Sequence, residues 1–315
     1  MAEISQKKVL VLGSSGMLGA MVTDYLSKSG VSVTATVRDP KWLSLGPKIA
    51  PEINWTELDA ESCNVAEISN LLRHQDYVIN AIGITKPYIK DECTYQVQRA
   101  INVNSLFPLK LKAAVEQSDT LILQIATDCV YSGSKGRYIE KDLHDPVDVY
   151  GKTKSLGEVS STSFNHFRCS IVGPEPVRGS FLWEWLLSQP QKASLNGYIN
   201  HDWNGITTLA LAKIFMGVIT EGNPTENLQH IIPSDTVTKF ELLELFSKCL
   251  SRRDLSISPT HAAETIDRTL NTSHENINEK LWLDAGYAGV PSVEDLITEI
   301  SKYDFRFNQI AFQSS

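Results

Sequence analysis

Short apolar runs alternate with amphipathic stretches along the first half of the chain. Residues 9–12 form a continuous apolar run, which is typical of a strand buried on both faces of a parallel sheet. Residues 17–28 carry apolar side chains at helical spacing, and Gly30 ends this helix before the next apolar run at 31–37. This order predicts a βαβ unit.

The same alternation continues to about residue 160. Further strands are predicted at 53–58, 77–82 and 121–126, and further helices at 65–73, 100–117 and 150–160. Parallel neighbours in a sheet need right-handed helical crossovers. The pattern therefore predicts an α/β fold with a doubly wound parallel sheet of the Rossmann type.

The rhythm becomes irregular after Phe167, where turn residues such as Gly173 and Pro174 interrupt it. Helices are predicted beyond this point at 181–188, 208–218, 239–250, 276–285 and 292–303, and a tail at 308–315. We predict two domains on this basis. The dinucleotide-binding domain comprises 1–172 plus roughly 196–236, and the smaller C-terminal substrate domain roughly 173–195 and 237–307.

The composition excludes several classes of protein. A chain of 315 residues is ample for a core without disulfide or metal staples, and no metal ion is expected. With 29 Lys+Arg and 37 Asp+Glu, the net charge of −8 disfavours nucleic acid as the main partner. The most apolar stretch, 207–220, contains Lys213 and is shorter than the roughly 20 residues of a membrane span. No membrane partner is therefore expected.

Cysteine usage and the N-terminus indicate a compartment. The five cysteines are scattered and form no CxxC pair, and residues 1–8 show no secretory signal. We therefore expect reduced thiols in a cytoplasmic protein.

A glycine-rich loop lies between the first predicted strand and the first predicted helix. Gly13 permits a tight turn, Gly16 lets the backbone approach a pyrophosphate, and Gly19 lets the helix pack closely on the strand. The alternative is a glycine-rich turn without a ligand. The GxxGxxG spacing is similar to that of the extended short-chain dehydrogenases/reductases. The predicted phosphate site comprises Gly13, Ser15, Gly16, Met17, Leu18 and Gly19.

The end of the second predicted strand selects the cofactor. Arg38 favours NADP, because a guanidinium can bind the 2′-phosphate with two hydrogen bonds. Asp39 keeps NAD open. Asp59 and the following Ala60 are predicted at the adenine edge, with a plain turn aspartate as the alternative for Asp59.

Three residues are candidates for acid/base chemistry. Tyr150 and Lys154 lie four residues apart, on one face of a predicted helix. A nearby ammonium lowers the pKa of a phenol from its free value of about 10, so we expect Lys154 to activate Tyr150 and to hold the nicotinamide ribose. A YxxxK pair alone is common on exposed helix faces. Here Thr127 also ends a predicted buried strand, where open α/β sheets bind ligands, and its hydroxyl can orient a carbonyl.

The central part of the chain resembles the dTDP-4-dehydrorhamnose reductase family. The matching motifs are TDCVYSG at 127–133, GRYIE at 136–140, and YGKTKSLGE at 150–158. Similarity extends over most of the chain and includes NAIGIT at 80–85, AINVN at 100–104 and DWNGITT at 202–208. The resemblance implies NADPH-dependent reduction, with NADH open, of a 4-keto group on a nucleotide-linked 6-deoxysugar in polysaccharide biosynthesis.

The resemblance also implies further site residues. It places Ala81, Ile82, Gly83 and Asn104 at the cofactor, and Thr85, Asp128, Cys129, Ile171 and Trp203 at the substrate. Arg268 is the basic candidate for a substrate phosphate, with an ordinary surface arginine as the alternative. Cys129 and Ile171 stand where the family usually carries aromatic residues, so the sugar is left open.

Two other functions stay open. An epimerase or dehydratase of the same superfamily is one, although dehydratases often pair Asp with Glu beside the threonine, and here Cys129 follows Asp128. A non-catalytic nucleotide-binding regulatory subunit is the other, and it has no need for Thr127, Tyr150 and Lys154 together. The sequence names neither the sugar nor the nucleotide, and a homodimer is one option for the oligomeric state.

Overall fold

The core of the protein is a seven-stranded sheet in the order β11-β6-β5-β4-β1-β2-β3. The computed structural model describes residues 7–309 except 117, 178, 180 and 223–226, so the predicted tail beyond 309 lies outside the described residues. All neighbouring strands are parallel, which confirms the predicted doubly wound α/β sheet. The strands are β1 (Lys8–Leu12), β2 (Ser32–Val37), β3 (Asn54–Glu57), β4 (Tyr77–Asn80), β5 (Leu121–Ala126), β6 (Phe164–Arg168) and β11 (Leu228–His230).

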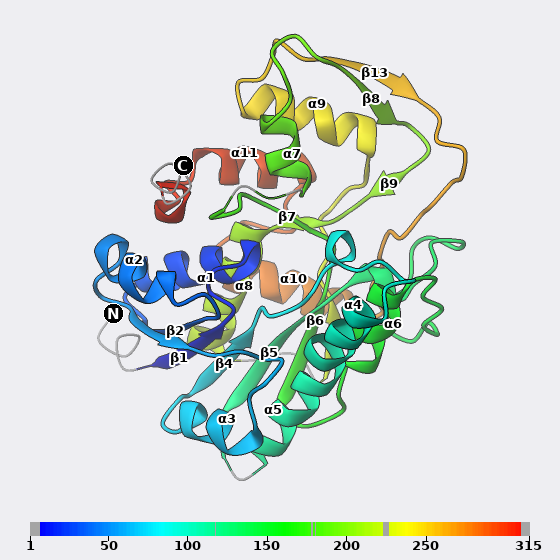
Figure 1. Ribbon diagram of the computed structural model, residues 1–315. Coiled ribbons are helices and arrows are strands. Elements are labelled where there is room, and N and C mark those ends of the chain that lie inside the picture. The colour runs from blue at the N-terminus through cyan, green and yellow to red at the C-terminus, as the bar shows by residue number, and fades with distance from the viewer. Residues whose placement is uncertain (1–6, 117, 178, 180, 223–226, 310–315) are drawn as a thin grey trace.

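Helices cover both faces of this sheet (Figure 1). Alternate residues of β1 pack into two different core clusters, Val9 and Val11 into one and Leu10 and Leu12 into the other. Both faces are therefore buried, which explains the continuous apolar run. The first cluster contains α1 (Met17–Lys28), α8 (Thr208–Glu221) and α10 (Glu275–Asp284), and the second contains α3 (Val65–Leu72) and α5 (Phe107–Val115).

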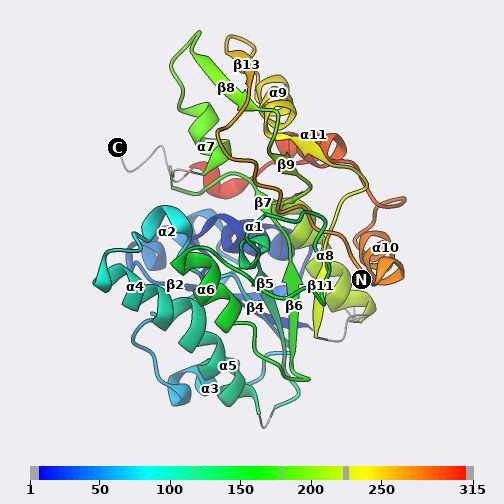
Figure 2. The ribbon, with the colours of Figure 1, turned by 90° about the vertical axis from the view of Figure 1, so that its right-hand side faces the viewer.

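A smaller half lies beyond the carboxyl ends of the strands (Figures 1 and 2). Its elements are α7 (Leu182–Leu187), β8 (Ser194–Tyr198), β9 (Asp202–Trp203), β12 (Val237–Thr238), α9 (Lys239–Cys249), β13 (Ser256–Thr260) and α11 (Val293–Lys302). β8 pairs in parallel with β13, and β9 pairs antiparallel with β12. Between the halves, β7 (Ile171–Val172) pairs with β10 (Ile206–Thr207). The domain boundaries given above stay a prediction.

The helix predicted at 100–117 is wrong in its start and its continuity. The chain instead forms α4 (Thr94–Ala100), a π-helical turn η3 (Ile101–Leu106) and then α5, while residue 117 lies outside the described residues. Such π turns are often found at functional sites. Asn104 lies within η3.

Other elements also differ from the prediction, among them α6 (Val149–Leu156) and α2 (Lys41–Ile49). α6 ends before residue 160, and Gly157 is its C-cap residue. Glycine is required there because an added Cβ would lie 2.0 Å from the Asn104 carbonyl oxygen of η3. The pattern does not predict α2, which contains the helix breakers Gly46 and Pro47. Within the described ranges, none of the helices is both long enough and apolar enough for a membrane crossing.

Candidate active site

A cleft of about 660 Å³ opens at the carboxyl ends of the parallel strands. This is the edge at which open α/β sheets bind ligands. It brings together residues that the sequence places far apart, from the first βα turn to β7. The predicted site residues that line it are Ser15, Gly16, Met17, Leu18, Arg38, Ala81, Ile82, Gly83, Thr85, Thr127, Asp128, Cys129, Tyr150, Lys154 and Ile171.

Gly13 and Gly19 have the steric tasks that the spacing predicts, and the approach of a pyrophosphate to Gly16 stays a prediction. Gly13 has a φ of +84°, and its N–H donates to the Thr36 hydroxyl at 3.1 Å. A Cβ at Gly19 would lie 2.1 Å from the Gly13 carbonyl oxygen, so close packing of α1 requires glycine there. A Cβ at Gly16 would meet that oxygen only at 3.4 Å. Gly16 lines the cleft at the start of α1, where no side chain caps the helix, so the helix N-terminus suits a pyrophosphate.

Arg38 lines the cleft, whereas Asp39 bonds to the start of the next helix. Arg38 is exposed and lines the cleft, together with Ser15. The Asp39 carboxylate instead accepts a hydrogen bond from the Lys41 N–H at 3.0 Å, at the start of α2. The charged side chain at the cofactor end of the cleft is therefore the cation, which fits a 2′-phosphate.

The Asp59 carboxylate stabilises the turn in which it lies. One carboxylate oxygen accepts from the Glu61 N–H at 3.1 Å and the other from the Ser62 hydroxyl at 3.2 Å. Asp59 and Ala60 are not among the described residues that line the cleft. The turn role given as the alternative is therefore present, and the adenine contact stays a prediction.

The start of α6 places Tyr150 against the loop that follows β5. Asp148 caps the helix, accepting from the Gly151 N–H at 2.9 Å, and forms an ion pair with Lys86 at 2.8 Å. Although burial raises it, the Gly151 N–H and Lys86 hold the pKa of Asp148 below its usual value. A Cβ at Gly151 would lie 2.2 Å from the Cys129 carbonyl oxygen. The glycine therefore lets the tyrosine helix pack directly on the threonine loop.

Thr127 joins Tyr150 in this arrangement. Its hydroxyl donates to the Asp128 carboxylate at 3.1 Å and accepts from the Cys129 N–H at 3.2 Å. The Tyr150 phenol lines the same cleft, and Thr127 lowers its pKa, so the two side chains lie close together. The two predicted acid/base residues are thus brought together from β5 and α6.

The expected effect of Lys154 on Tyr150 is wrong in this structure. Burial raises the pKa of Tyr150, the neighbouring Cys129 and Asp128 raise it further, and Thr127 opposes them. The Lys154 ammonium donates to the Ile125 carbonyl at 2.9 Å, and burial lowers its pKa to about 8. Tyr150 therefore stays a protonated phenol at neutral pH, which is the form that donates a proton.

Asn104 supports the site from behind the cleft wall, and its predicted contact with the cofactor stays a prediction. Its amide accepts from the Ile84 N–H at 2.8 Å and donates to the Ile84 carbonyl at 2.9 Å. A third bond runs to the Thr153 hydroxyl at 3.1 Å. The buried amide thus ties the loop after β4 to the helix that carries Tyr150 and Lys154.

Trp203 and Arg268 also act from behind the lining residues. The Trp203 indole N–H donates to the Ser170 hydroxyl at 2.8 Å, and Ser170 lines the cleft. The Arg268 Nε donates to the Tyr131 carbonyl at 2.9 Å. Burial raises the pKa of Asp128, and the charges of Arg268 and Lys239 oppose this. Both cations therefore lie near the carboxylate beside Thr127.

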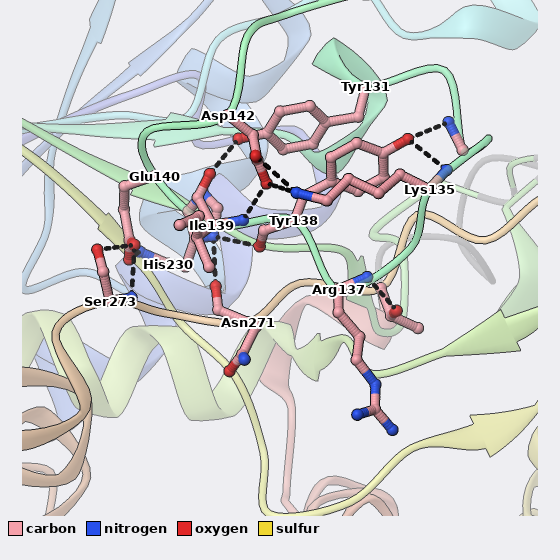
Figure 3. Close-up of polar contacts among 12 residues, drawn as sticks. Tyr131, Lys135, Arg137, Tyr138, Ile139, Glu140, Asp142, His230, Asn271 and Ser273 are labelled. Carbon is pink, nitrogen blue, oxygen red and sulfur yellow. Dashed lines mark hydrogen bonds and ion pairs between the residues drawn. The ribbon is translucent and has the colours of Figure 1, made fainter.

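The segment after the threonine loop is fixed to the C-terminal half (Figure 3). The rings of Tyr131 and Tyr138 stack with centroids 4.2 Å apart, and the Tyr138 N–H donates to the Thr269 carbonyl at 2.9 Å. The Glu140 carboxylate accepts from the His230 N–H at 3.0 Å and from the Ser273 hydroxyl at 2.9 Å. These bonds hold Arg268, next to Thr269, close to the threonine loop.

The sequence pattern does not predict several of the residues that line the cleft. Lys86 and Tyr88 line it just beyond the predicted Thr85. Glu175 lines it from the segment before α7, and burial raises the pKa of its carboxyl to about 7. Glu175 lies in a Gly/Pro-rich stretch without helical or strand periodicity, so no local signal marks it.

Comparison with known proteins identifies the family. Residues 7–269 match the family described as the RmlD substrate binding domain. The chain belongs to this family. Two similar relatives are named dTDP-4-dehydrorhamnose reductase. The protein from Streptomyces griseus is 32% identical over 159 residues, 50% of this chain and 46% of that protein. The protein from Aggregatibacter actinomycetemcomitans is 37% identical over 152 residues, 48% of this chain and 45% of that protein.

The RmlD-family chain spans about half the length of these curated relatives. A solved structure resembles it over a longer stretch. The dTDP-4-dehydrorhamnose reductase from Bacillus anthracis, in complex with NADP, superposes with a TM-score of 0.71 at 15% identity, covering 93% of this chain and 98% of that one. At this identity the likeness concerns the fold, and the activity of the present chain is argued below.

Proposed function

We propose that this RmlD-family protein reduces the 4-keto group of a nucleotide-linked 6-deoxysugar with NADPH. One observation carries the proposal: Thr127, Tyr150 and Lys154 line the same cleft as the phosphate loop. Family membership and the names of the relatives support the same reaction class.

The proposed roles follow from the positions of the three side chains. NADPH, when bound, supplies the hydride that converts the ketone carbon to an alcohol carbon. Tyr150 donates its phenolic proton to the carbonyl oxygen, and its raised pKa keeps that proton available. Thr127 turns its hydroxyl from Asp128 toward the same oxygen and so orients the ketone. Lys154 holds the ribose hydroxyls while its charge lies beside the carboxyl end of β5.

The two ends of the proposed substrate require different contacts. Arg268, with Lys239 beside Asp128, supplies positive charge for a phosphate of the nucleotide. Cys129 and Ile171 line the cleft near the sugar and are smaller than the aromatic residues usual in the resembled family. We therefore propose a 4-keto sugar whose substituents differ from those of the rhamnose precursor.

The decisive test is turnover with a panel of dTDP-, UDP-, GDP- and CDP-linked 4-keto sugars. A reductase consumes one NADPH for each sugar reduced. An epimerase or dehydratase changes the sugar without net consumption of NADPH, and a regulatory subunit does neither. Failure to consume NADPH with every member of the panel would refute the proposal.

We further propose a homodimer that forms through α4, η3, α5 and α6, which lie side by side (Figure 2). This face exposes large apolar side chains, including Tyr95 and Leu156, which are 66% and 65% exposed. Light scattering should report a dimer for the wild type and a monomer for Leu156→Glu. A cytoplasmic location stays a prediction from cysteine usage.

A further inference from the structure

The chain returns from the C-terminal half to the cofactor end of the fold through residues 303–307, here called the C-terminal clamp. It follows α11, which packs against α8, α9 and β10. β10 pairs with β7, the strand that carries Ile171 of the cleft. One helix therefore connects the substrate end of the cleft to the clamp.

Arg306 fixes the clamp to α1. Its Nε contacts the fully buried Asp24 carboxylate at 2.5 Å, and one terminal nitrogen donates to the Ser27 hydroxyl at 2.6 Å. The other terminal nitrogen pairs with Glu52 at 2.7 Å, in the segment between α2 and β3. A single guanidinium thus joins the helix of the phosphate loop to the segment that precedes β3.

Phe307 completes an aromatic cluster beneath α2. Its fully buried ring lies 6.1 Å from Trp42 of α2 and 5.8 Å from Trp55 of β3, and the two indoles lie 6.1 Å apart. Edge-to-face contacts of this kind favour one relative orientation of the rings. Gly46 of α2 presses on the Trp55 ring so closely that an added Cβ would lie 2.4 Å from it. The position of α2 therefore depends on this cluster.

Arg38 lies between the elements that the clamp holds. It directly follows β2, whose Val37 pairs with Glu57 of β3, and it precedes the turn into α2. That turn is closed by the Trp42 N–H, which donates to the Asp39 carbonyl at 3.1 Å. The Arg38 side chain is exposed and lines the cleft, and the backbone on either side of it sets where the side chain begins and which part of the cleft its guanidinium can reach.

We propose that Arg306 and Phe307 are positioning residues for cofactor selection, because they hold the backbone that aims Arg38 at the 2′-phosphate of NADPH. This inference rests on the proposed use of NADPH. It adds that the preference for NADPH over NADH depends on a segment of the C-terminal half that lies behind α1 and α2, away from the cleft lining.

The test compares the dissociation constants of NADPH and NADH, measured by calorimetry on the full chain. Phe307→Leu keeps an apolar side chain but removes the aromatic ring that contacts Trp42 and Trp55. Arg306→Lys keeps the positive charge but replaces the branched guanidinium, which has three bonding nitrogens, with a single ammonium. We expect each to weaken NADPH binding about fivefold to tenfold and to leave NADH binding within about twofold. Phe246→Leu is the matched control, since its ring is equally buried but packs on Trp183 of α7, in the substrate half. It should leave the preference unchanged.

A double variant separates positioning from general loss of stability. If the clamp acts through Arg38, Phe307→Leu in an Arg38→Ala background causes no further loss of NADPH preference. An unchanged preference in both clamp variants, or equal loss of NADH and NADPH binding, overturns the inference while the proposed reduction stands. A wild type that binds both cofactors equally also overturns it. A wild type that binds neither refutes the proposed function itself.

Discussion

The two ends of the cleft are built in different ways. The cofactor end comes from neighbouring parts of the first βαβ unit, and backbone geometry shapes it: the left-handed turn at Gly13, the close approach at Gly19 and the uncapped start of α1. The end that we propose for the substrate is assembled from the loop after β5, from β7, from the Trp203 indole behind Ser170, and from Arg268 on the Tyr131 carbonyl. These parts are far apart in the sequence.

Because the two ends are built differently, we expect turnover, cofactor choice and sugar choice to depend on different parts of the cleft. The cofactor end needs the backbone in one conformation, so its residues are constrained by sterics. The substrate end relies on side chains that bond to one another across the two halves, so its shape can change without disturbing the sheet. We expect substitutions in the centre of the cleft to affect turnover, at the cofactor end to affect cofactor choice, and at the substrate end to affect sugar choice.

Tyr150→Phe should have the largest effect, because the cofactor and the sugar bound at the two ends of the cleft react only when Tyr150 donates its proton between them. The variant keeps the ring and its packing but loses the proton donor, so turnover should fall by about 10² or more. Thermal unfolding and NADPH affinity should stay near the wild-type values. Turnover within a few-fold of the wild type would show that the proton comes from another group.

Arg38→Ala should act on the cofactor end alone. Loss of a charge-assisted contact to the 2′-phosphate costs about 1.5 to 3 kcal/mol, or about tenfold to a hundredfold in NADPH affinity. NADH affinity should hardly change. Asp39→Ala is the matched control, since this carboxylate bonds to Lys41 and should not affect the preference. A retained NADPH preference in Arg38→Ala would exclude Arg38 from the site.

The substrate end predicts a sugar preference. With Cys129 and Ile171 in place of larger aromatic groups, the pocket has lost stacking surface and gained volume, so dTDP-4-dehydrorhamnose should be a poor substrate. A different 4-keto sugar should be favoured by about tenfold in kcat/KM. The comparison runs over the nucleotide-sugar panel under one set of conditions. Preference for the rhamnose precursor would show that both substitutions are neutral to the sugar.

The smallest expected effect is a pH dependence of cofactor binding. Burial lowers the pKa of Lys154 to about 8, so its ammonium is charged below that pH and loses its proton as the pH rises through it. NADPH affinity should therefore fall several-fold between about pH 7 and pH 9. Lys239 also has a pKa lowered to about 8, so Lys239→Met is the control and should keep this dependence. Lys154→Met should abolish it.

Patterns within short stretches of the sequence predict the cofactor end of the cleft well. α1 and β5 have the predicted bounds, Gly13 and Gly19 have their predicted steric tasks, and Thr127 meets Tyr150. These features depend on periodicity and on residue types that sterics restrict to a few positions.

Tertiary contacts explain what local signals miss. The pKa of Tyr150 depends on burial and on carboxylates and a thiol from other elements, so helical spacing to Lys154 gives the wrong direction. Asn104 bonds to partners 20 and 49 positions away, and no pattern marks the pairing. Glu175 lines the cleft from an irregular segment. Phe307 contacts Trp42 only because the end of the chain returns to α2.

Isotope transfer tests the central claim most directly. The protein is incubated with NADPH that carries deuterium at both C4 positions of the nicotinamide and with the best 4-keto sugar of the panel, and the product is examined by mass spectrometry and NMR. We predict one deuterium on C4 of the sugar for each NADPH oxidised, and about a hundredfold less labelled product with Tyr150→Phe over the same time. A product that forms without label, or NADPH that stays unoxidised with every sugar, would contradict the assignment as a 4-ketoreductase.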